Sequence, residues 1–393
     1  MTYDTILIGA GPIGIEMATV LKRAGLRYLH LESGAIGETI TRWPRNTRFF
    51  SSPEWIAIAG VPIQTVGQEI VTGERYLAYL RQVVEVFDLD VHTYEPVTAV
   101  TGSAGDFEVA TRDLAGAEHT YHAATVVLAT GDMNHPRTLG VPGEDLPHVT
   151  HYWTDPHLYY RRRLLIVGGR NSAVEAALRC WRAGVKVAIS YRGGILDEKR
   201  LISRLHLEID LLIRNGQIDF YPLSEPAEIR PGSVALRGVA ADENLASTAA
   251  SAHGGRANLT EPGTTREVDA DFVYLATGFE MDQSLYEALG VTTEGDERKP
   301  THDPQTMESN VPGVYVVGTA IGGNQRGYKV FITTSHEHCT KAARAIAARA
   351  EAEAEAVDAE PGAAVAARAD SIPDSWVGNH PSRDYPLSSK DVE

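Results

Sequence analysis

The chain has 393 residues, a formal net charge of -16 and two cysteines, Cys180 and Cys339. This length favours two or three domains with a large core, and the negative charge argues against nucleic acid or an anionic membrane as a partner. Two cysteines so far apart in the sequence exclude a disulfide scaffold, a C-x-x-C redox pair and a cysteine-rich zinc site, so we expect no metal centre.

The chain begins with an apolar strand rather than a targeting segment. This strand starts at residue 3, which leaves no room for a signal peptide. No apolar run approaches the ~18 residues that are needed to span a bilayer. We therefore expect a cytoplasmic protein without a membrane partner.

A glycine-rich turn follows this strand and opens a helix that ends at Gly25. The turn has the G-x-G-x-x-G spacing, which places a dinucleotide pyrophosphate at a helix N-terminus, and its glycines are Gly9, Gly11 and Gly14. A second strand ends in Glu32, a carboxylate suited to accept a hydrogen bond from a ribose hydroxyl. The opening segment is therefore predicted to bind a dinucleotide.

The chain then forms a loop, a helix and a small sheet. The polar and aromatic residues 36–63, which include Ser51 and Ser52, predict a functional loop with short helices. A helix is expected over 74–88, and strands are expected at 91–100, 106–112, 117–122 and 125–131. The last strand ends in Ala129-Thr130-Gly131, which brings the backbone close to a ligand at the carboxyl end of the sheet.

The strand, glycine turn and helix are repeated after a connection over 132–163. Gly9 to Gly25 spans sixteen residues, and so does Gly168 to Gly184. A duplicated spacing is much harder to obtain by chance than a single glycine motif. The sequence therefore predicts two dinucleotide-binding units.

The two units differ at the end of their second strand. Counting twenty-three residues from the first glycine of each unit gives Glu32 in one, and Tyr191 followed by Arg192 in the other. A carboxylate suits a free ribose and an arginine suits a 2′-phosphate, so we expect FAD in the first unit and NADPH in the second. A solvated strand-end arginine is the alternative for Arg192. Arg170 stands where the second glycine belongs, and it would either grip the pyrophosphate or push it outward.

The C-terminal half completes both units. A helix is expected over 198–215, a surface insertion over 240–266, and a strand over 271–278 that again ends in Ala-Thr-Gly. A strand over 313–318 is expected to lead through the loop Gly322–Gln325 directly into a helix that runs to about residue 356. The tail from Glu360 is rich in Pro, Ala and Ser, and we expect it to be disordered or wrapped on a surface.

The N-terminus of that last helix would stabilise an anion such as a reduced flavin. The weak candidates for catalysis are therefore the polar residues near it and two serines of the earlier loop, namely Ser51, Ser52, Asn324, Gln325 and Lys329. A surface lysine is an equally good interpretation of Lys329.

The two cysteines have different surroundings in the sequence. Cys180 lies on a small-residue helix face that would pack on a sheet, which predicts a buried, inert thiol. Cys339 follows His336-Glu-His338, so a redox role stays open beside a structural one. Histidines at i and i+2 point to different helix faces, which argues against a metal site there.

The sequence resembles the thioredoxin-reductase-like flavoproteins, which have two nested dinucleotide domains. The two glycine units, the two Ala-Thr-Gly stops and the strand before Gly318 carry this resemblance. More narrowly, the chain is similar to the bacillithiol disulfide reductase family in the segments Phe49-Phe-Ser-Ser52, Gly168-Gly-Arg-Asn-Ser172, Tyr191-Arg-Gly193 and Thr306-Met-Glu-Ser-Asn-Val-Pro-Gly-Val314. The resemblance covers about residues 1–350 and implies FAD, NADPH and the reduction of a low-molecular-weight thiol disulfide.

Three features depart from what the resemblance implies. Ile13 stands where the family carries a cysteine, no C-x-x-C occurs in the second unit, and Thr319 replaces an Asp after Gly318. We therefore expect electrons to pass from the flavin directly to an acceptor such as a small disulfide. Two alternatives remain open. One is a flavin-dependent monooxygenase, because His151 and Trp153 lie in a faintly similar linker motif, and the other is a redox sensor that binds FAD and NADPH without turnover.

The predicted fold is α/β, with two nested Rossmann-like domains of three-layer β/β/α type. Residues 1–131 and 279–350 would form the FAD domain, 132–278 the NADPH domain, and 351–393 an acidic tail. The expected FAD contacts are Gly9, Gly11, Pro12, Ile13, Gly14, Glu32, Val97, Ala129, Thr130, Gly131, Gly318 and Thr319. The expected NADPH contacts are Gly168, Gly169, Arg170, Asn171, Ser172, Tyr191, Arg192, Ala276, Thr277 and Gly278. We also expect a homo-oligomer.

Overall fold

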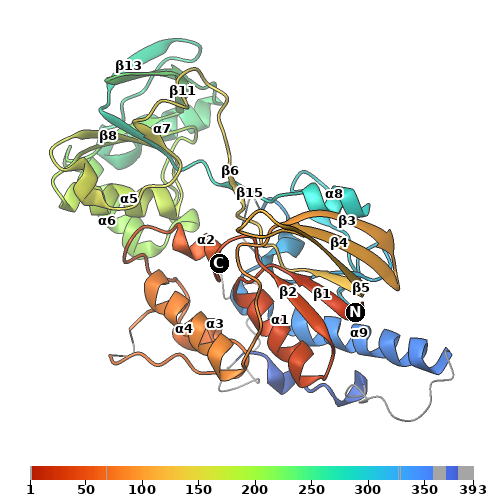
Figure 1. The fold of residues 1–393 in the computed structure, drawn as a ribbon. Helices are drawn as coiled ribbons and strands as arrows, with labels where there is room; N and C mark the ends of the chain where they lie inside the picture. The colour runs from red at the N-terminus through yellow and green to blue at the C-terminus, as the bar shows by residue number, and fades with distance from the viewer. Residues whose placement is uncertain (1, 68, 326, 328, 357–368, 379–393) are drawn as a thin grey trace. The chain divides into compact units, whose positions relative to one another are not determined.

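The chain divides into two compact units in the computed structural model, which describes residues 2–67, 69–325, 327, 329–356 and 369–378. Unit 1 consists of Met1–Arg42, Asn46–His135 and Phe279–Val392, and unit 2 of Trp43–Arg45 and Pro136–Gly278 (Figure 1). Unit 1 is therefore interrupted by unit 2 in the sequence. The divisions fall at 135/136 and 278/279, and residues 43–45 also belong to unit 2.

Unit 1 is built on a six-stranded sheet with the order β2-β1-β5-β4-β3, in which β18 also pairs with β5. Its strands are β1 (Thr2–Ile8), β2 (Tyr28–Leu31), β3 (Val97–Ser103), β4 (Asp106–Arg112), β5 (Glu118–Leu128) and β18 (Val314–Val316). The pairs β1–β2, β1–β5 and β5–β18 are parallel, whereas β3, β4 and β5 form an antiparallel meander. The strands expected at 117–122 and 125–131 are one strand, whose first half pairs with β4 and whose second half pairs with β18.

Alternation along β1 separates the two faces of this sheet. Ile6 and Ile8 belong to a buried cluster with Tyr286 of α8 (Ser284–Leu289), and Leu7 between them points to the other face. On that other face lie α1 (Pro12–Arg23) and α9 (His336–Ala356), which contact each other and β1 (Figure 1). The sheet is thus covered on both sides, as a parallel sheet requires.

Shorter elements complete unit 1. Its remaining helices are α2 (Glu38–Thr41), α3 (Pro53–Ile56) and α4 (Gly73–Val86), and two-residue strand pairs join β6 (His135–Pro136) with β15 (Phe279–Glu280) and β16 (Thr293–Glu294) with β17 (Lys299–Pro300). The Thr72 hydroxyl caps α4 by accepting a hydrogen bond from the Arg75 amide. One expectation was wrong: α9 begins at His336, so no long helix starts directly after the loop that ends at Gln325.

Unit 2 contains a second parallel sheet and a small antiparallel one. The parallel sheet has the order β10-β9-β8-β14-β7, with strands β7 (Val149–Thr150), β8 (Arg163–Val167), β9 (Lys186–Tyr191), β10 (Asp219–Pro222) and β14 (Phe272–Leu275). Helices α5 (Asn171–Arg182) and α6 (Ser203–Arg214) supply buried side chains to its core. The antiparallel sheet consists of β11 (Ser224–Arg230), β12 (Ser233–Gly238) and β13 (Thr265–Asp269).

The expected surface insertion lies between β12 and β13 and contains α7 (Glu243–Gly255), whose backbone is kinked at residues 252–254. It packs on unit 2, because Ala249 is fully buried and the His253 Nδ1 lies 2.7 Å from the Asp210 carboxylate of α6. Among the residues that the structure describes, no helix is long and apolar enough to cross a membrane.

Part of the tail packs on unit 1. Residues 357–368 and 379–393, on which part of the expected disorder falls, lie outside the described residues. Residues 369–378 include two short 3-10 turns, Ala369–Ser371 and Asp374–Trp376, and pack on unit 1 through the buried side chain of Ile372. This segment takes the second of the two expected forms, a chain wrapped on a surface.

Candidate functional site

Close backbone packing requires glycine at two of the three glycine positions of the turn in unit 1. A Cβ at Gly9, where φ is +107°, would lie 2.5 Å from the Ala129 carbonyl oxygen. A Cβ at Gly14 would lie 2.0 Å from the Gly9 carbonyl oxygen, which no side chain can tolerate. At Gly11 a Cβ would meet nothing within 4 Å, so this position leaves open space beside the start of α1.

The start of α1 offers backbone donors to that space. Pro12 is the first helical residue and has no N–H, and the next amides, those of Ile13 and Gly14, precede the first intrahelical hydrogen bond, from the Ile15 N–H to the Gly11 carbonyl. A helix N-terminus with open space in front of it favours an anion. These residues therefore fit a pyrophosphate group.

Glu32 lies directly beneath this turn and is only 7% exposed. Its Oε2 accepts a hydrogen bond from the Ala10 N–H at 2.6 Å, and its Oε1 accepts one from the Gly34 N–H at 2.8 Å. A carboxylate has about four acceptor positions, so Glu32 can hold the turn and still accept a hydroxyl. In the same strand, His30 is buried with its Nε2 2.9 Å from the Gly9 carbonyl oxygen, and burial lowers the pKa of His30 to about 4.

The Ala-Thr-Gly stop of β5 lies at the same edge of the sheet. The Ala129 N–H donates to the Ile8 carbonyl, and the Thr130 hydroxyl is 2.8 Å from the Tyr286 hydroxyl. Gly131 has a φ of +71°, which favours glycine. Val97, the other FAD contact expected in this region, begins β3 and packs against the buried cluster beneath the sheet.

Asp132 follows this stop, and the sequence reasoning missed it. It is 8% exposed, and its carboxylate accepts hydrogen bonds from the Gln325 side chain at 2.8 Å and from Thr319. Burial raises the pKa of Asp132, although both hydrogen bonds act in the opposite direction. Its position one residue after Ala-Thr-Gly is the signal that could have found it.

The candidate loop side chains are occupied by contacts within unit 1. The Gln325 amide donates to Asp132 and to the Val330 carbonyl, and its oxygen accepts from the Lys329 and Val330 amides. The Asn324 side chain accepts a hydrogen bond from the Met281 N–H at 2.7 Å. Asn324 and Gln325 therefore shape this loop, and the Lys329 side chain is exposed.

The two serines of the earlier loop are half-buried. Ser52 precedes α3 as its N-cap residue, but its side chain makes no capping hydrogen bond. Ser51 lies in the bend before it.

Ile13 and Gly318 bring the first turn and the end of β18 together. Gly318 has a φ of +76°, and a Cβ there would lie 3.3 Å from the Ile13 side chain. The Gly318 N–H donates to the His338 Nδ1 at 3.2 Å, which requires that nitrogen to be unprotonated. Burial is the main reason that the pKa of His338 falls to about 3, so the imidazole is neutral and can accept this bond.

A second buried cluster joins the same helices and was also missed. Glu16 of α1 is fully buried, and its carboxylate lies 2.7 Å from the His336 Nδ1. The His336 Nε2 is 3.1 Å from the Trp55 carbonyl oxygen. Because both ring nitrogens face acceptors, His336 fits the imidazolium form. Burial lowers the pKa of His336, but Glu16 and the Trp55 carbonyl outweigh this and the net shift is upward.

Both thiols are buried and held in the protonated form. Burial raises the pKa of Cys180 to about 12, and it raises that of Cys339 well above its ordinary value. The Cys339 Sγ lies 3.6 Å from the Ile13 carbonyl oxygen, as a weak donor would. Among the described residues, no group of three or more His, Cys, Asp or Glu side chains could hold a metal ion.

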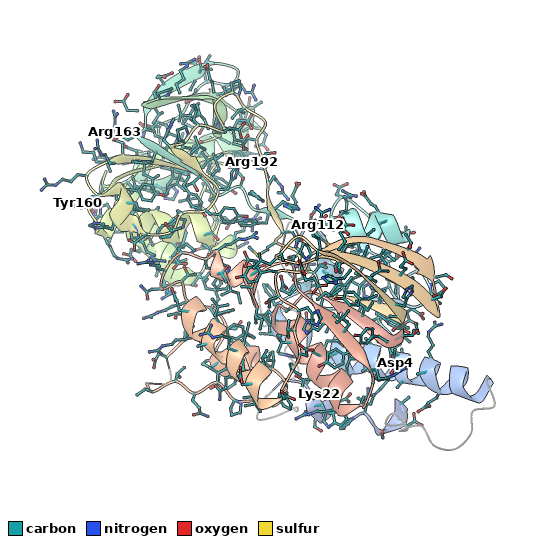
Figure 2. The ribbon with its side chains drawn as sticks, viewed as in Figure 1. Asp4, Lys22, Arg112, Tyr160, Arg163 and Arg192 are labelled. Atoms are coloured by element: carbon teal, nitrogen blue, oxygen red, sulfur yellow. The ribbon has the colours of Figure 1, made fainter. Side chains whose placement is uncertain are left out.

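In the glycine turn of unit 2, both a backbone carbonyl and an aromatic ring lie close to the glycines. A Cβ at Gly168, where φ is +145°, would lie 2.5 Å from the Ala276 carbonyl oxygen. A Cβ at Gly169 would lie 2.6 Å from the Tyr191 ring, so this ring covers the turn. Arg170 is exposed immediately before α5 and Arg192 is exposed at the end of β9, both within unit 2 (Figure 2 labels Arg192).

The other residues expected at this second turn have mixed surroundings. The Asn171 Oδ1 accepts a hydrogen bond from the Ile202 N–H at 3.0 Å, and Ser172 is exposed. The Ala276 N–H donates to the Val167 carbonyl, the Thr277 hydroxyl donates to the Arg137 carbonyl, and Gly278 has a φ of +93°. The turn and the Ala-Thr-Gly stop thus meet at one edge of the sheet, as they do in unit 1.

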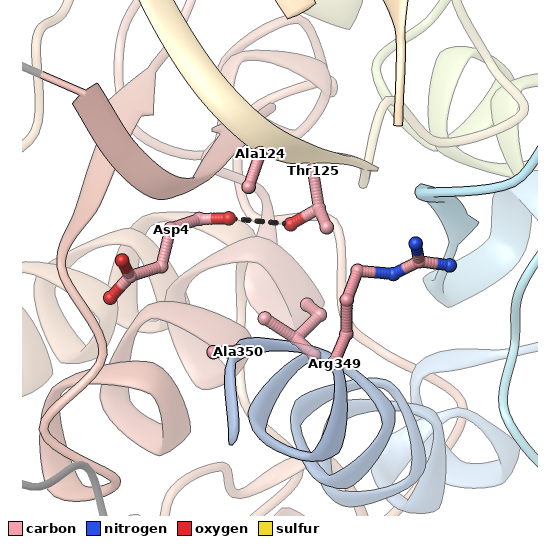
Figure 3. A pocket seen from close by; sticks show the side chains of 6 residues that line it. Asp4, Ala124, Thr125, Arg349 and Ala350 are labelled. Atoms are coloured by element: carbon pink, nitrogen blue, oxygen red, sulfur yellow. Dashed lines mark hydrogen bonds between the residues drawn. The ribbon is translucent and has the colours of Figure 1, made fainter. Parts of the chain in front are cut away.

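Two other features have structural roles. The linker residues His151 and Trp153 lie in unit 2, where His151 pairs with Glu144 at 3.3 Å and Trp153 is buried against Tyr274. A depression near the start of β1 and the middle of β5 is lined by Asp4, Ala124, Thr125, Ile346, Arg349 and Ala350 (Figure 3). Its lining includes none of the residues of the glycine turn, and the Thr125 hydroxyl donates there to the Asp4 carbonyl.

Residues 6–318 match the family described as pyridine nucleotide-disulphide oxidoreductase. The chain belongs to this family. Bacilliredoxin reductase Bdr of Bacillus subtilis (strain 168) is 30% identical over 344 residues, which are 88% of this chain and 97% of that protein. The structure of bacillithiol disulfide reductase Bdr (YpdA) from Bacillus cereus is 29% identical, with a TM-score of 0.79 over 89% of this chain and all of that one.

A third relative is named for a different acceptor. Ferredoxin--NADP reductase of Ignicoccus hospitalis is 26% identical over 319 residues, which are 80% of this chain and 89% of that protein. These comparisons confirm the predicted fold class and the predicted family resemblance. The chain is a flavoprotein oxidoreductase of the pyridine nucleotide-disulphide oxidoreductase family.

Proposed function

We propose that this oxidoreductase binds FAD in unit 1 and NADPH in unit 2, and that it reduces a low-molecular-weight thiol disulfide or a related acceptor directly at the flavin. The observation that carries the proposal is the difference between the two glycine turns. Unit 1 has open space at Gly11 above the Glu32 carboxylate, whereas unit 2 has Tyr191 and the exposed Arg192. A carboxylate suits the FAD ribose, and an arginine suits the 2′-phosphate of NADPH.

The proposal assigns a binding role to residues of each glycine turn. The start of α1 would hold the FAD pyrophosphate, with Glu32 on the ribose and the stop at Ala129–Gly131 beside it. Arg170 and Arg192 would bind the phosphates of NADPH. FAD supplies the two-electron chemistry by taking a hydride from NADPH and reducing the acceptor, so that NADPH, a proton and a disulfide yield NADP⁺ and two thiols.

The names of the relatives support the proposed acceptor class. The Bacillus relatives are named as reductases of bacilliredoxin and of bacillithiol disulfide, which supports a disulfide acceptor here. The ferredoxin--NADP reductase of Ignicoccus hospitalis supports including a protein redox partner in the assay panel. No observation favours a monooxygenase, because His151 and Trp153 are engaged in packing within unit 2.

An anaerobic titration tests the proposal. One equivalent of NADPH should bleach the flavin fully, without a thiolate-to-flavin charge-transfer band, because Cys180 and Cys339 are buried and protonated. Uptake of two equivalents, or the appearance of that band, would show a second redox centre and contradict direct transfer. A panel of disulfides, assayed by NADPH consumption and compared with hydrogen peroxide production, then identifies the acceptor.

A double variant of the cysteines gives the matching prediction. Cys180→Ser with Cys339→Ser should leave the rate of flavin reduction and acceptor turnover within about twofold of the parent, after correction for flavin content. Loss of acceptor turnover with intact flavin reduction would make one of the thiols the relay.

A further inference from the structure

The segment 369–378 reaches a buried charge on the helix that follows the first glycine turn. Glu16 accepts three hydrogen bonds from the described residues, which come from the Ala59 N–H at 2.8 Å, the His336 Nδ1 at 2.7 Å and the Gly378 N–H at 2.6 Å. The last donor belongs to the tail. A carboxylate without exposure to water depends on such donors, so the tail completes the surroundings of Glu16.

The rest of this segment is held through main-chain groups and the Asp374 carboxylate. The Arg344 guanidinium donates to the Ile372 carbonyl at 2.6 and 3.0 Å and to the Asp374 carboxylate at 2.7 Å. The Gly60 N–H donates to the Gly378 carbonyl at 2.7 Å. Gly378 has a φ of +62°, and its α-carbon lies against the His336 ring, where a Cβ would be 3.6 Å away.

Two side chains add apolar and cationic contacts. Ile372 is 1% exposed, and Trp376 lies with its ring centroid 5.6 Å from the Arg23 guanidinium at the end of α1. Arg23 also contacts the Phe87 ring at 4.7 Å. The segment is therefore bound across α1, α9 and residues 59–60 of unit 1. We call residues 369–378 the strap.

Glu16 and His336 each lie two residues from a group that belongs to, or contacts, a turn of the expected flavin site. Glu16 lies two residues after Gly14, whose helix start is the expected pyrophosphate site. His336 opens α9, and two residues later His338 accepts the hydrogen bond from the Gly318 N–H. A contact that fixes Glu16 against His336 therefore fixes both turns.

We propose that the docking of the strap on Glu16 keeps the two turns in the arrangement that retains FAD. The proposal rests on FAD being the cofactor of unit 1. The strap lies beyond residue 318, where the match to the family ends.

A matched pair of full-length variants tests the strap. Ile372→Asp places a charge on its buried side chain, and Ser375→Asp places the same charge on an exposed one. We expect Ile372→Asp to weaken FAD binding about tenfold in fluorescence titrations of the apoprotein, which is about 1.4 kcal/mol, while Ser375→Asp stays within twofold. Gly378→Pro, which removes the donor to Glu16 and cannot adopt the positive φ, should act like Ile372→Asp.

A synthetic peptide with the sequence of residues 369–378 supplies the second measurement. Added to the Ile372→Asp variant, it should restore FAD binding toward the parent value. Equal FAD binding by all variants would overturn the proposal, and so would a lower melting temperature with unchanged FAD affinity, since the strap would then be a purely structural clamp.

A parent protein that binds no FAD would instead contradict the proposed function, and with it the link from the strap to the flavin. Hydrogen exchange at the amides of Ala59 and Gly60 would still report strap docking separately. Those amides should exchange faster in Ile372→Asp than in Ser375→Asp if the strap docks on unit 1 as described.

Discussion

The two glycine turns have the same spacing, but different residues stand where the helix packs against the strand. In unit 1 the third position is Gly14, where a Cβ would lie 2.0 Å from the Gly9 carbonyl oxygen. In unit 2 the same position is Ala173, which is fully buried with its methyl group in place. The second position is open at Gly11 and occupied by the exposed Arg170 in unit 2. A repeated spacing therefore conserves the route of the chain, while single residues decide how closely a ligand can approach.

The largest effect should come from exchanging the third residue of each turn. Gly14→Ala should lower the free energy of unfolding of unit 1 by about 3 kcal/mol, the upper end for overpacking, because the new methyl group collides with backbone. Ala173→Gly should cost unit 2 only about 1 kcal/mol, the helix propensity difference. Urea unfolding of both variants measures this. A Gly14→Ala protein as stable as the parent would show that the two turns are equally tolerant.

Removal of the Glu32 carboxylate should affect only unit 1. Glu32→Ala leaves the Ala10 N–H without its partner and should weaken FAD binding by ~1.5–3 kcal/mol, the range for a hydrogen bond to a charged group. Glu32→Gln, which keeps one acceptor oxygen, should lose less. FAD titration of the apoproteins gives the affinities, and NADPH affinity serves as the control. Unchanged FAD binding in Glu32→Ala would contradict the assignment of unit 1.

Acidification should destabilise unit 1 through two of its buried histidines. The pKa values of His30 and His338 in unit 1 are lowered to about 4 and about 3, mainly by burial. Between pH ~6.5 and ~5 the unfolded chain binds protons that these two side chains do not bind when folded, so the stability of unit 1 should fall as the pH falls. The limit is about 1.4 kcal/mol per pH unit for each histidine.

His336 does not alter this trend. Its pKa is raised, so below pH ~6.5 it is protonated in both the folded and the unfolded state. Urea unfolding at pH 6.5, 5.8 and 5.2 measures the slope, and His30→Asn should make it shallower. A parent protein whose stability does not change over this interval would show that His30 and His338 charge freely in the folded state.

The smallest effect is expected at Arg192. Arg192→Ala should raise the KM for NADPH about tenfold, or about 1.4 kcal/mol, and leave the KM for NADH unchanged, because only NADPH carries the 2′-phosphate. Arg237→Ala, on β12 and paired with Glu225, controls for the loss of a positive charge in unit 2. Equal use of NADPH and NADH by the parent would contradict the proposal that Arg192 binds the 2′-phosphate.

The sequence predicted the fold class, because apolar strands, glycine spacing and the Ala-Thr-Gly stops are local patterns that repeat. It did not predict the continuous strand β5, since residues 117–122 are half exposed and 125–128 are buried, so their patterns differ. It also placed the last helix too early, because the Gln325 side chain closes a loop with Val330 and Lys329 that has no periodic signal.

The sequence predicted the parts of the candidate site that the backbone forms. It did not predict the parts in which side chains distant in the sequence meet. Gly9, Gly14 and Gly168 were identified because close backbone approach selects glycine at those positions. Glu16 and His336 lie 320 residues apart, and a glutamate inside an amphipathic helix is normally read as solvated. Only the folded chain shows that this carboxylate is buried and shared with the tail.

The division of unit 1 around unit 2 has a consequence for synthesis on the ribosome. The second unit is nearly contiguous, so its chain is available once residue 278 has emerged. At that moment the first unit, although begun earlier, still lacks β18 and α9, and the second half of β5 can pair with β1 on one edge but not yet with β18 on the other. Because domains fold as units during translation, the nascent chain should finish its inserted unit first and close the outer one last, with residues 369–378 arriving as the final piece.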